Sequence, residues 1–341
     1  MGNFKEDIAR IRAFVFDVDG VMTDGGITVT PEGEFLRTFY AKDGYALSLA
    51  LKKGYRIAII TGGRGKALQV RFDMIFNIVA PEIEVIALIR EKRLSREEEI
   101  EYLRSHGVDF DFKKAEYSIN QGIWGTSVGG KETLTSSETL PEEAYPSQLK
   151  ETQPRRVTLT FEKGEFVALD GKRFDDRIAA IQALQAIASR YAIGRDMHIG
   201  DTIIGIKGRV GFEAAAPMVI IKAHHMLEKH TLTKWQLYWK DQISAFYGNY
   251  LHEGQYYDPV MRDFEAFLES TQRTVSGDVY VELHPYRFVL VGIKSDHDLM
   301  SNKFGAYGET MNDWTSEDVK GFGKIFGNQN KIYYKVNEKL K

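Results

Sequence analysis

Two aspartates near the start of the chain stand in a pattern that suits phosphoryl transfer. Asp17 follows the apolar run AFVF, and Asp19 comes two residues later, with Gly20 allowing a tight turn. The Asp17 carboxylate can attack a phosphate monoester while the Asp19 carboxyl group protonates the departing oxygen. Mg²⁺ held by the same two aspartates would neutralise charge on the phosphate. A second apolar run, RIAII, ends at Thr61 and Gly62, whose hydroxyl and amide groups can bind phosphate oxygens.

Three polar side chains further along the chain could hold a zwitterionic amino acid. The guanidinium group of Arg71 can bind a carboxylate through two parallel hydrogen bonds. Ser118 and Ser127 are nine residues apart in a segment rich in glycine and polar residues, and their hydroxyl groups suit such a substrate. An arginine in a surface salt bridge and serines in a loop without a function would give the same sequence pattern. The residues alone therefore leave both interpretations open.

The histidines give a weaker signal. His224 and His225 are adjacent on a predicted helix, so their side chains point about 100° apart. His224 and Glu228 have the i, i+4 spacing of a helical pair, but we predict no third ligand for a metal. We therefore interpret them as ordinary satisfied side chains.

The secondary structure predicted to position these residues differs between the first and the second part of the chain. In the first part, apolar runs at 13–18, 56–60 and 84–89 predict strands of a parallel sheet, and a β-hairpin is predicted from Gly26 to Phe39. The second part predicts antiparallel pairs alternating with long helices, and a polar, proline-containing connector at 133–155. The strands are predicted at 156–161, 165–170, 202–206, 279–283 and 287–293, and the helices at 178–193, 214–229, 233–251 and 259–272. The predicted fold class is α/β plus α+β.

Composition limits the partners and the cell compartment. The chain has 341 residues, no cysteine and a formal net charge of −3. This length suits two or three domains, and the near-balanced charge predicts neither nucleic acid nor an anionic membrane as partner. No disulfide can form, and neither a secretory signal nor a membrane-spanning run is visible. We predict a cytoplasmic protein with small-molecule substrates.

The first 67 residues resemble the haloacid dehalogenase superfamily, and within it the 3-deoxy-D-manno-octulosonate 8-phosphate phosphatases. The motifs that carry the resemblance are FVFDVDGVMTDG, the hairpin ending in GEFLRTF, and KDGYALSLALKKGYRIAIITGG. The resemblance implies that Asp17 is the nucleophile and Asp19 the acid/base, with Mg²⁺ at these two residues. It also implies that Thr61 and Gly62 bind phosphate, and that hairpins meet between the subunits of a tetramer.

From Gln69 onward the chain resembles the argininosuccinate synthase family. The motifs are QVRFD, SREEEIEYL, YSINQGIWGTSVGG and GIKGRVGFE. The family joins citrulline to aspartate, using ATP to adenylate the ureido oxygen and releasing AMP and pyrophosphate. The resemblance implies that Arg71, Ser118 and Ser127 contact citrulline, and that the C-terminal region forms a homotetramer.

The chain departs from this family's pattern at three places. The ATP-binding loop of the family, SGGLDTS or close to it, does not occur in the sequence, so we predict that the N-terminal ATP-binding domain is missing. The family's Asn-Asp pair, which serves aspartate and citrulline, is replaced by Ala67-Leu68. A glutamate and a tyrosine that contact citrulline in the family fall on Gly200 and Phe212. Because glycine cannot pair with the α-ammonium group, an acyl-citrulline is an alternative substrate.

Taken together, these patterns predict a truncated Rossmann-like parallel-sheet lobe with a hairpin, a larger α+β synthetase-type domain and a C-terminal oligomerisation tail. The predicted function is that of a synthase-like ligase in arginine biosynthesis, impaired by the missing domain. The alternatives are a Mg²⁺-dependent sugar-phosphate phosphatase, or a non-catalytic hybrid or gene-model artefact that associates with intact synthase. The predicted boundaries are 1–67 (phosphatase fragment), 68–132 (ligase remnant), 133–155 (linker or surface excursion), 156–314 (synthetase domain) and 315–341 (tail).

Overall fold

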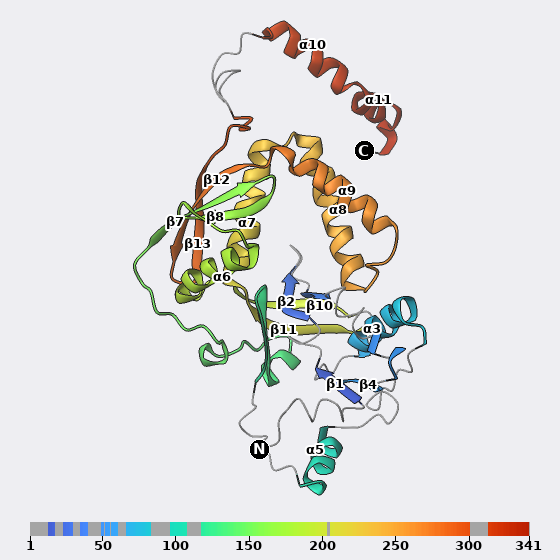
Figure 1. The fold of residues 1–341 in the computed structure, drawn as a ribbon. Helices are drawn as coiled ribbons and strands as arrows, with labels where there is room; N and C mark the ends of the chain where they lie inside the picture. Colours follow the sequence, from blue (N-terminus) through green and yellow to red (C-terminus); the bar gives the residue numbers. More distant parts are fainter. Residues whose placement is uncertain are drawn as a thin grey trace. The chain divides into compact units, whose positions relative to one another are not determined.

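The chain divides into two compact units, residues 1–297 and 298–341 (Figure 1). The computed structural model describes residues 13–17, 23–29, 35–39, 49–50, 52–54, 56–60, 66–82, 96–107, 117–202, 205–300 and 313–340. Each unit is considered by itself.

Two short strand pairs lie in the first part of the chain. Strand β1 (Ala13–Asp17) pairs in parallel with β4 (Arg56–Ile60), with Asp17 opposite Ile60. Strand β2 (Thr23–Val29) pairs antiparallel with β3 (Phe35–Phe39). The parallel pairing of the two apolar runs and the hairpin are both confirmed. The strand predicted at 84–89 lies outside the described residues.

Two helices follow these strands along the chain. Helix α3 (Lys66–Val79) carries Arg71, and α5 (Arg96–Ser105) ends just before Gly107, whose φ is +78°. A left-handed residue just past a helix is the usual place for glycine.

A four-stranded antiparallel sheet forms the next layer. Its order is β10 (Arg195–Asp201), β11 (Lys207–Glu213), β6 (Gly125–Gly129) and β5 (Ser118–Gly122). The strand predicted at 202–206 is wrong. Thr202 donates its amide to the Ile206 carbonyl at 3.0 Å and accepts from the Gly205 amide at 2.8 Å, so these residues form part of the turn between β10 and β11. The strand that precedes this turn, β10, is polar because one of its faces is not part of the core.

The segment at 131–148 covers one face of this sheet. Leu140 and Ala144 pack on Val128 of β6, which is fully buried. Arg209 of β11 donates to the backbone carbonyls of Glu132, Thr135 and Glu138 at 2.9, 2.5 and 2.6 Å. This polar segment is therefore held in place by an arginine that satisfies its backbone acceptors.

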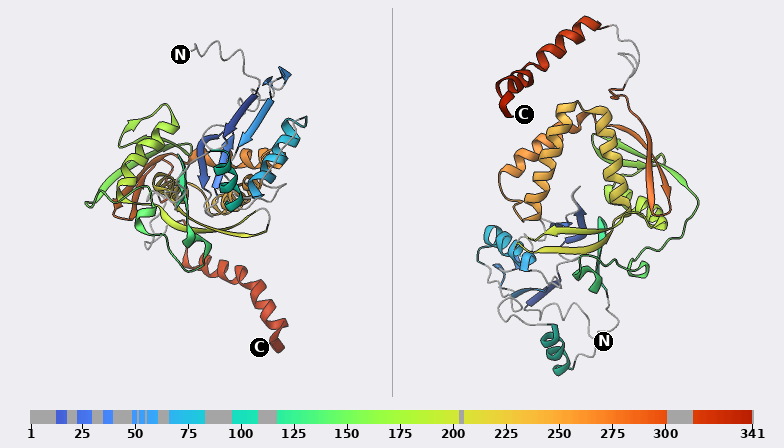
Figure 2. Two further views of the ribbon diagram at one scale, coloured as in Figure 1. Left: turned by 90° about the horizontal axis from the view of Figure 1, so that it is seen from below. Right: turned by 180° about the vertical axis from the view of Figure 1, so that it is seen from behind.

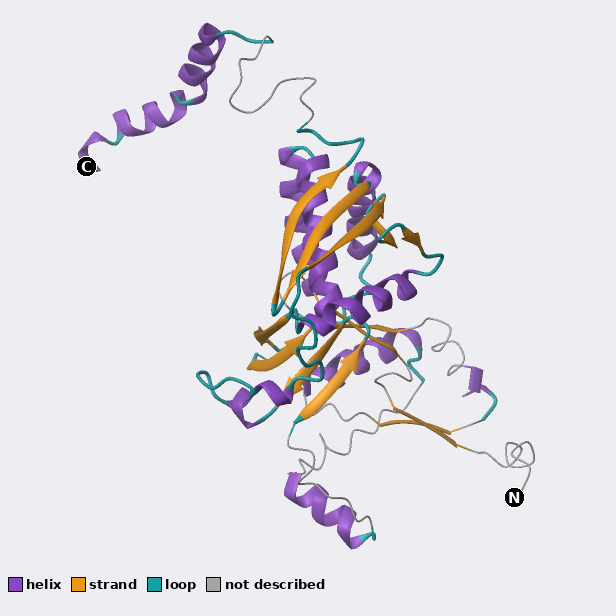
Figure 3. Ribbon diagram, turned by 90° about the vertical axis from the view of Figure 1, so that its left-hand side faces the viewer, coloured by secondary structure: helices purple, strands orange, loops and turns teal. Residues whose placement is uncertain are grey.

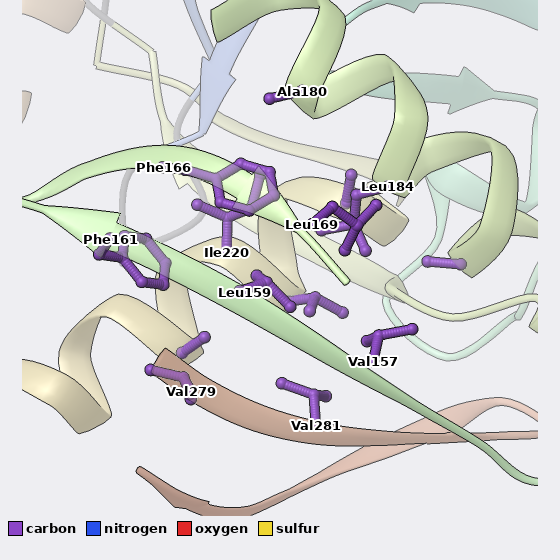
Figure 4. Close-up of a cluster of buried hydrophobic side chains, with 14 of the residues drawn as sticks. Val157, Leu159, Phe161, Phe166, Leu169, Ala180, Leu184, Ile220, Val279 and Val281 are labelled. Carbon is purple, nitrogen blue, oxygen red and sulfur yellow. The ribbon is translucent and has the colours of Figure 1, made fainter. Parts of the chain in front are cut away.

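A second antiparallel sheet of five strands carries the main core. Its order is β13 (Arg287–Lys294), β12 (Gly277–His284), β7 (Arg155–Glu162), β8 (Glu165–Leu169) and β9 (Lys172–Arg173). Alternate residues of β7 and β12 are fully buried, which is the period of a strand with one face in the core. They meet Leu184 of α6 (Arg177–Ala188) and residues of α7 (Ala215–Thr231), as Figure 4 shows for Val157, Leu159 and Phe161. The predicted hairpins and both helices are confirmed, although α6 ends earlier than predicted, at Ala188.

Two further helices complete the first unit. Helix α8 (Lys234–His252) begins with a capping box in which Thr233 accepts from the Gln236 amide. Helix α9 (Val260–Thr271) begins after Asp258, whose carboxylate accepts from the Val260 amide at 3.0 Å. The two helices pack side by side (Figures 2 and 3).

The second unit contains two short helices, α10 (Ser316–Phe326) and α11 (Asn328–Val336). Thr315 caps α10 in a capping box with Asp318. Large apolar side chains of both helices are exposed: Val319, Phe322, Ile325, Phe326, Ile332, Tyr333, Tyr334 and Val336.

Candidate functional site

One face of the four-stranded sheet carries polar side chains of β5, β6 and β10 together with Phe212 of β11. Ser127 lies opposite Asn120 on one side and Phe212 on the other, and Phe212 lies opposite Asp196. Because side chains alternate along a strand, Ser118 shares this face with Ser127. Asn120 donates its side-chain amide to the Ser127 hydroxyl at 3.5 Å. The two serines that the sequence singled out therefore belong to one surface.

The same alternation places two residues of β10 on this face. His198 and Gly200 follow Asp196 at intervals of two residues. A Cβ atom built on Gly200 would lie 2.7 Å from Nε2 of His198, so the imidazole ring occupies the space beside the glycine. Burial lowers the pKa of His198, and the nearby charge of Asp196 works in the opposite direction.

Arg71 joins this region through a histidine at the end of α8. Its guanidinium Nη2 lies 2.9 Å from Nε2 and 3.3 Å from Nδ1 of the His252 ring. Burial, the charge of Arg71 and the proximity of His198 lower the pKa of His252 to about 4, against a hydrogen bond with the Asp201 backbone. His252 is therefore neutral at pH 7 and connects Arg71 with strand β10.

A glycine allows the end of α8 to approach Arg71 closely. Gly254 has φ +80°, and a Cβ atom built on it would lie 3.3 Å from Cγ and 3.4 Å from Cβ of Arg71. Gln255 adds a contact to α3, with its side-chain nitrogen 3.9 Å from Sδ of Met74. The turn after α8 thus packs directly on the aliphatic stem of Arg71.

The structure places Ser118 and Ser127 on one sheet face and Arg71 beside His252, and it describes less of the predicted phosphate site. Asp17 ends β1 beside Ile60, the residue before Thr61. Asp19, Thr61 and Gly62 lie outside the described residues.

Three residues of the region around the sheet face were not predicted from the sequence: Asp196, His198 and His252. The alternation in RDMHIGD would have shown that Asp196 and His198 share one face of a strand. His252 gave no local signal, because its contact with Arg71 spans 181 residues.

A second polar cluster lies between α7 and α8, on the wall of a cavity of about 650 Å³. His225, Glu228 and Asp241 offer three ligand atoms within 4.8 Å of one another, although the sequence analysis found no third ligand here. Nζ of Lys240, however, lies 2.7 Å from Glu228 and 3.3 Å from Asp241. The lysine ammonium group already contacts both carboxylates and would repel a cation, so the cluster does not fit a resident metal ion. Among the described residues, no helix is long and apolar enough to cross a membrane.

Comparison with known proteins assigns the family. The model of the argininosuccinate synthase C-terminal domain matches residues 117–333, more than half of the chain. The model of the N-terminal HUP domain of the same family matches residues 46–109. This chain belongs to the argininosuccinate synthase family.

Individual relatives agree with this assignment. The argininosuccinate synthase of Dictyoglomus turgidum is 35% identical over 292 residues, which cover 85% of this chain and 73% of the relative. The synthase of Pyrococcus furiosus is 34% identical over 295 residues, covering 85% and 71%. That of Methanocaldococcus jannaschii is 29% identical over 331 residues, covering 90% and 83%.

The HUP-domain match corrects one expectation. The N-terminal domain of the family is not missing, because residues 46–109 match its model. The match also includes 46–67, which we had assigned to a phosphatase fragment. A buried strand that ends in a glycine-rich phosphate-binding loop is common to many α/β domains, so RIAIITGG did not distinguish the two families.

Proposed function

We propose that this chain acts as an argininosuccinate synthase-type ligase in arginine biosynthesis. In this reaction citrulline is joined to aspartate, and ATP is converted to AMP and pyrophosphate. The observation that carries the proposal is the shared sheet face of Ser118, Ser127 and Phe212, reached from α3 by the Arg71–His252 contact. Family membership supports the reaction.

The proposed roles follow from the chemistry of each group. Arg71 binds the α-carboxylate of citrulline, and the hydroxyl groups of Ser118 and Ser127 bind its polar groups. Asp196 is the only acidic residue on this face of the four described strands, so it is the group that can meet a free α-ammonium. An acyl-citrulline has no free α-ammonium group and would not need Asp196 as a partner. Titration with each compound distinguishes the two substrates.

The part of the site that would bind ATP matches the family pattern less completely than the part that would bind citrulline. ATP is proposed as substrate with Mg²⁺, but the loop SGGLDTS does not occur. We assign no residue to Mg²⁺, because the His225, Glu228 and Asp241 cluster contains Lys240. We therefore expect citrulline binding to be retained and turnover by the isolated chain to be slow.

Calorimetric titration of citrulline, and separately of N-acetylcitrulline, tests the binding site. Ser127→Ala should weaken binding about 2- to 10-fold, and Arg71→Met about 10- to 100-fold, as loss of a neutral and of charge-assisted hydrogen bonds predicts. Ser270→Ala, an exposed serine on α9, is the matched control. Absence of binding by the unmodified protein to either compound would overturn the proposal. A pyrophosphate-release assay with aspartate, ATP and Mg²⁺ then measures turnover.

The finer features of the fold are also proposals. We infer that the β1–β4 pair is part of a Rossmann-like lobe, and that the boundaries given above separate the functional segments. The second unit is proposed as an oligomerisation tail in a homotetramer. Its support is the row of exposed apolar side chains on α10 and α11, which a partner surface would cover.

A second candidate function rests on the end of β1. Asp17 ends β1 opposite Ile60 of β4, and open α/β sheets bind ligands at the carboxyl ends of their parallel strands. A phosphatase acting through Asp17 and Asp19 with Mg²⁺ would release phosphate from sugar phosphates. Activity that persists in Asp17→Asn would rule it out.

A further inference from the structure

Strand β10, which carries Asp196, has little buried apolar surface to hold it in place. It lies at an edge of the four-stranded sheet, where its one neighbouring strand is β11. None of its residues belongs to the fully buried core, Met197 is only partly buried, and Ile199 is 60% exposed. Because buried apolar side chains are the usual anchor of a strand, β10 requires an anchor of another kind.

Arg195, the first residue of β10, supplies that anchor through its guanidinium group. Its side chain is only 10% exposed. Nε donates to Glu213 of β11 at 3.1 Å, Nη1 donates to Glu142 at 2.7 Å, and Nη2 donates to the Ser147 carbonyl. The group also lies over the ring of Tyr145, 4.6 Å from its centre. Each of the three nitrogens is therefore engaged, which fixes the plane of the guanidinium group.

Glu213 completes this network from the neighbouring strand. It is 3% exposed, lies directly opposite Arg195 in the ladder, and accepts from the Ser147 amide at 3.2 Å. A buried ion pair with further hydrogen bonds is held in one geometry, because a displacement would leave a buried charge without its partner. The pair therefore fixes the position of β10 along β11.

The same pair controls the side chain that follows Arg195 in the strand. Successive residues of a strand point to opposite faces, so Arg195 and Asp196 lie on different faces of the sheet. Asp196 pairs with Phe212 in the ladder, one step beyond the ion pair, and Phe212 pairs with Ser127. A slip of β10 by one residue would turn Asp196 away from the face that carries Ser127.

We propose that Arg195 is a positioning residue which, with Glu213, holds β10 in the register that presents Asp196 to the α-ammonium group of citrulline. This inference rests on the proposed function, because it takes Asp196 as the partner of that group. It assigns a role to an arginine on the opposite face of the sheet from the proposed substrate.

A double-mutant cycle separates positioning from a general structural effect. Arg195→Lys keeps the charge but loses the planar fork, so we expect it to weaken citrulline binding about 5- to 20-fold by calorimetry. In the Asp196→Asn background the same change should weaken binding by less than about 2-fold, because the carboxylate that Arg195 positions is gone. A purely structural role would weaken binding equally in both backgrounds. Arg190→Lys, which alters an exposed contact with Glu151, is the matched control.

Glu142→Gln is a milder variant that keeps the test decisive if Arg195→Lys does not fold. Glu142 is half exposed, and its substitution leaves the buried ion pair of Arg195 with Glu213 in place. We expect citrulline binding to weaken about 2- to 5-fold, and only while Asp196 is present. N-Acetylcitrulline has no ammonium group, so its binding should change by less than about 2-fold. Equal weakening for both compounds would overturn the inference.

The outcomes also separate this inference from the proposed function. If the unmodified protein binds citrulline and the Arg195 change acts equally in both backgrounds, or if only N-acetylcitrulline binds, the inference fails and the proposed function stands. If neither compound binds, the proposed function fails. The inference is then decided by histidine NMR without ligand, because the charge of Asp196 raises the pKa of His198. Arg195→Lys should lower that pKa towards its value in Asp196→Asn, and an unchanged pKa would overturn the inference.

Discussion

The buried carboxylate of Glu228 should make a large, pH-dependent contribution to stability. Glu228 lies on α7 with no exposed surface. One carboxylate oxygen lies 2.7 Å from Nζ of Lys240 and 3.2 Å from Nδ1 of His225, and the other accepts from Gln272 at 2.9 Å. Burial would raise the pKa of Glu228, but the hydrogen bond with His225 and the neighbouring charges outweigh it and lower the pKa from 4.5 to about 2.

The magnitude follows from the linkage between protonation and folding. One pKa unit corresponds to about 1.4 kcal/mol, so the shift contributes roughly 3 kcal/mol to the free energy of unfolding at pH 7. Because the folded-state pKa is the lower one, the contribution is complete above about pH 4.5 and is lost as the pH falls towards 2. It should be roughly 2 kcal/mol at pH 3.

The perturbation is Glu228→Gln, measured by urea denaturation at pH 7 and at pH 3. We expect a loss of about 3 kcal/mol at pH 7, a fall in melting temperature of roughly 6–12 °C, and a difference from the unmodified protein that shrinks to roughly 2 kcal/mol at pH 3. Glu228→Leu should cost about 3–5 kcal/mol because Lys240 keeps a buried charge, and adding Lys240→Met should restore most of that loss. Glu269→Gln, on the exposed side of α9, controls for the change in charge. A Gln variant as stable as the unmodified protein, or an equal difference at both pH values, would refute the reasoning.

Three further changes test packing, backbone and assembly. Leu159→Ala, at a fully buried position of β7, should lower the free energy of unfolding by about 2–5 kcal/mol, and a loss below about 1 kcal/mol in urea denaturation would contradict the core described here. Gly194→Ala should destabilise by at least about 1–3 kcal/mol, because φ is +80° and the added Cβ would lie 2.5 Å from the Ala214 carbonyl oxygen; an unchanged melting temperature would contradict this. Phe322→Asp with Phe326→Asp, a stacked and exposed pair on α10, should convert the proposed oligomer to a smaller species in light scattering, whereas an unchanged mass would exclude α10 from the interface.

Local pattern predicted most of the secondary structure. The hairpins of β7 with β8 and β12 with β13, and the helices α7 to α9, follow from periodicity and capping residues that neighbouring sequence determines. The strand at 202–206 was predicted wrongly because its apolar composition outweighed the turn signal of Gly205, which has φ +77°. The polar strand β10 was missed for the converse reason, since only its place in the sheet makes it a strand.

The site could be predicted in part only. Arg71, Ser118 and Ser127 have chemically distinctive side chains within motifs, so the sequence could single them out. The contact of Arg71 with His252 depends on how α3 meets the end of α8, and no short-range pattern encodes that.

Gly200 and His198 of strand β10 depend on each other. Glycine weakens a strand interior, so its presence in β10 requires a reason. The reason is His198, whose Nε2 lies 2.7 Å from where a Cβ of residue 200 would be. A glutamate could enter at 200 only if the imidazole moved, and the imidazole can keep its position only while residue 200 lacks a side chain. The two residues therefore form a matched pair that presents an imidazole on this sheet face.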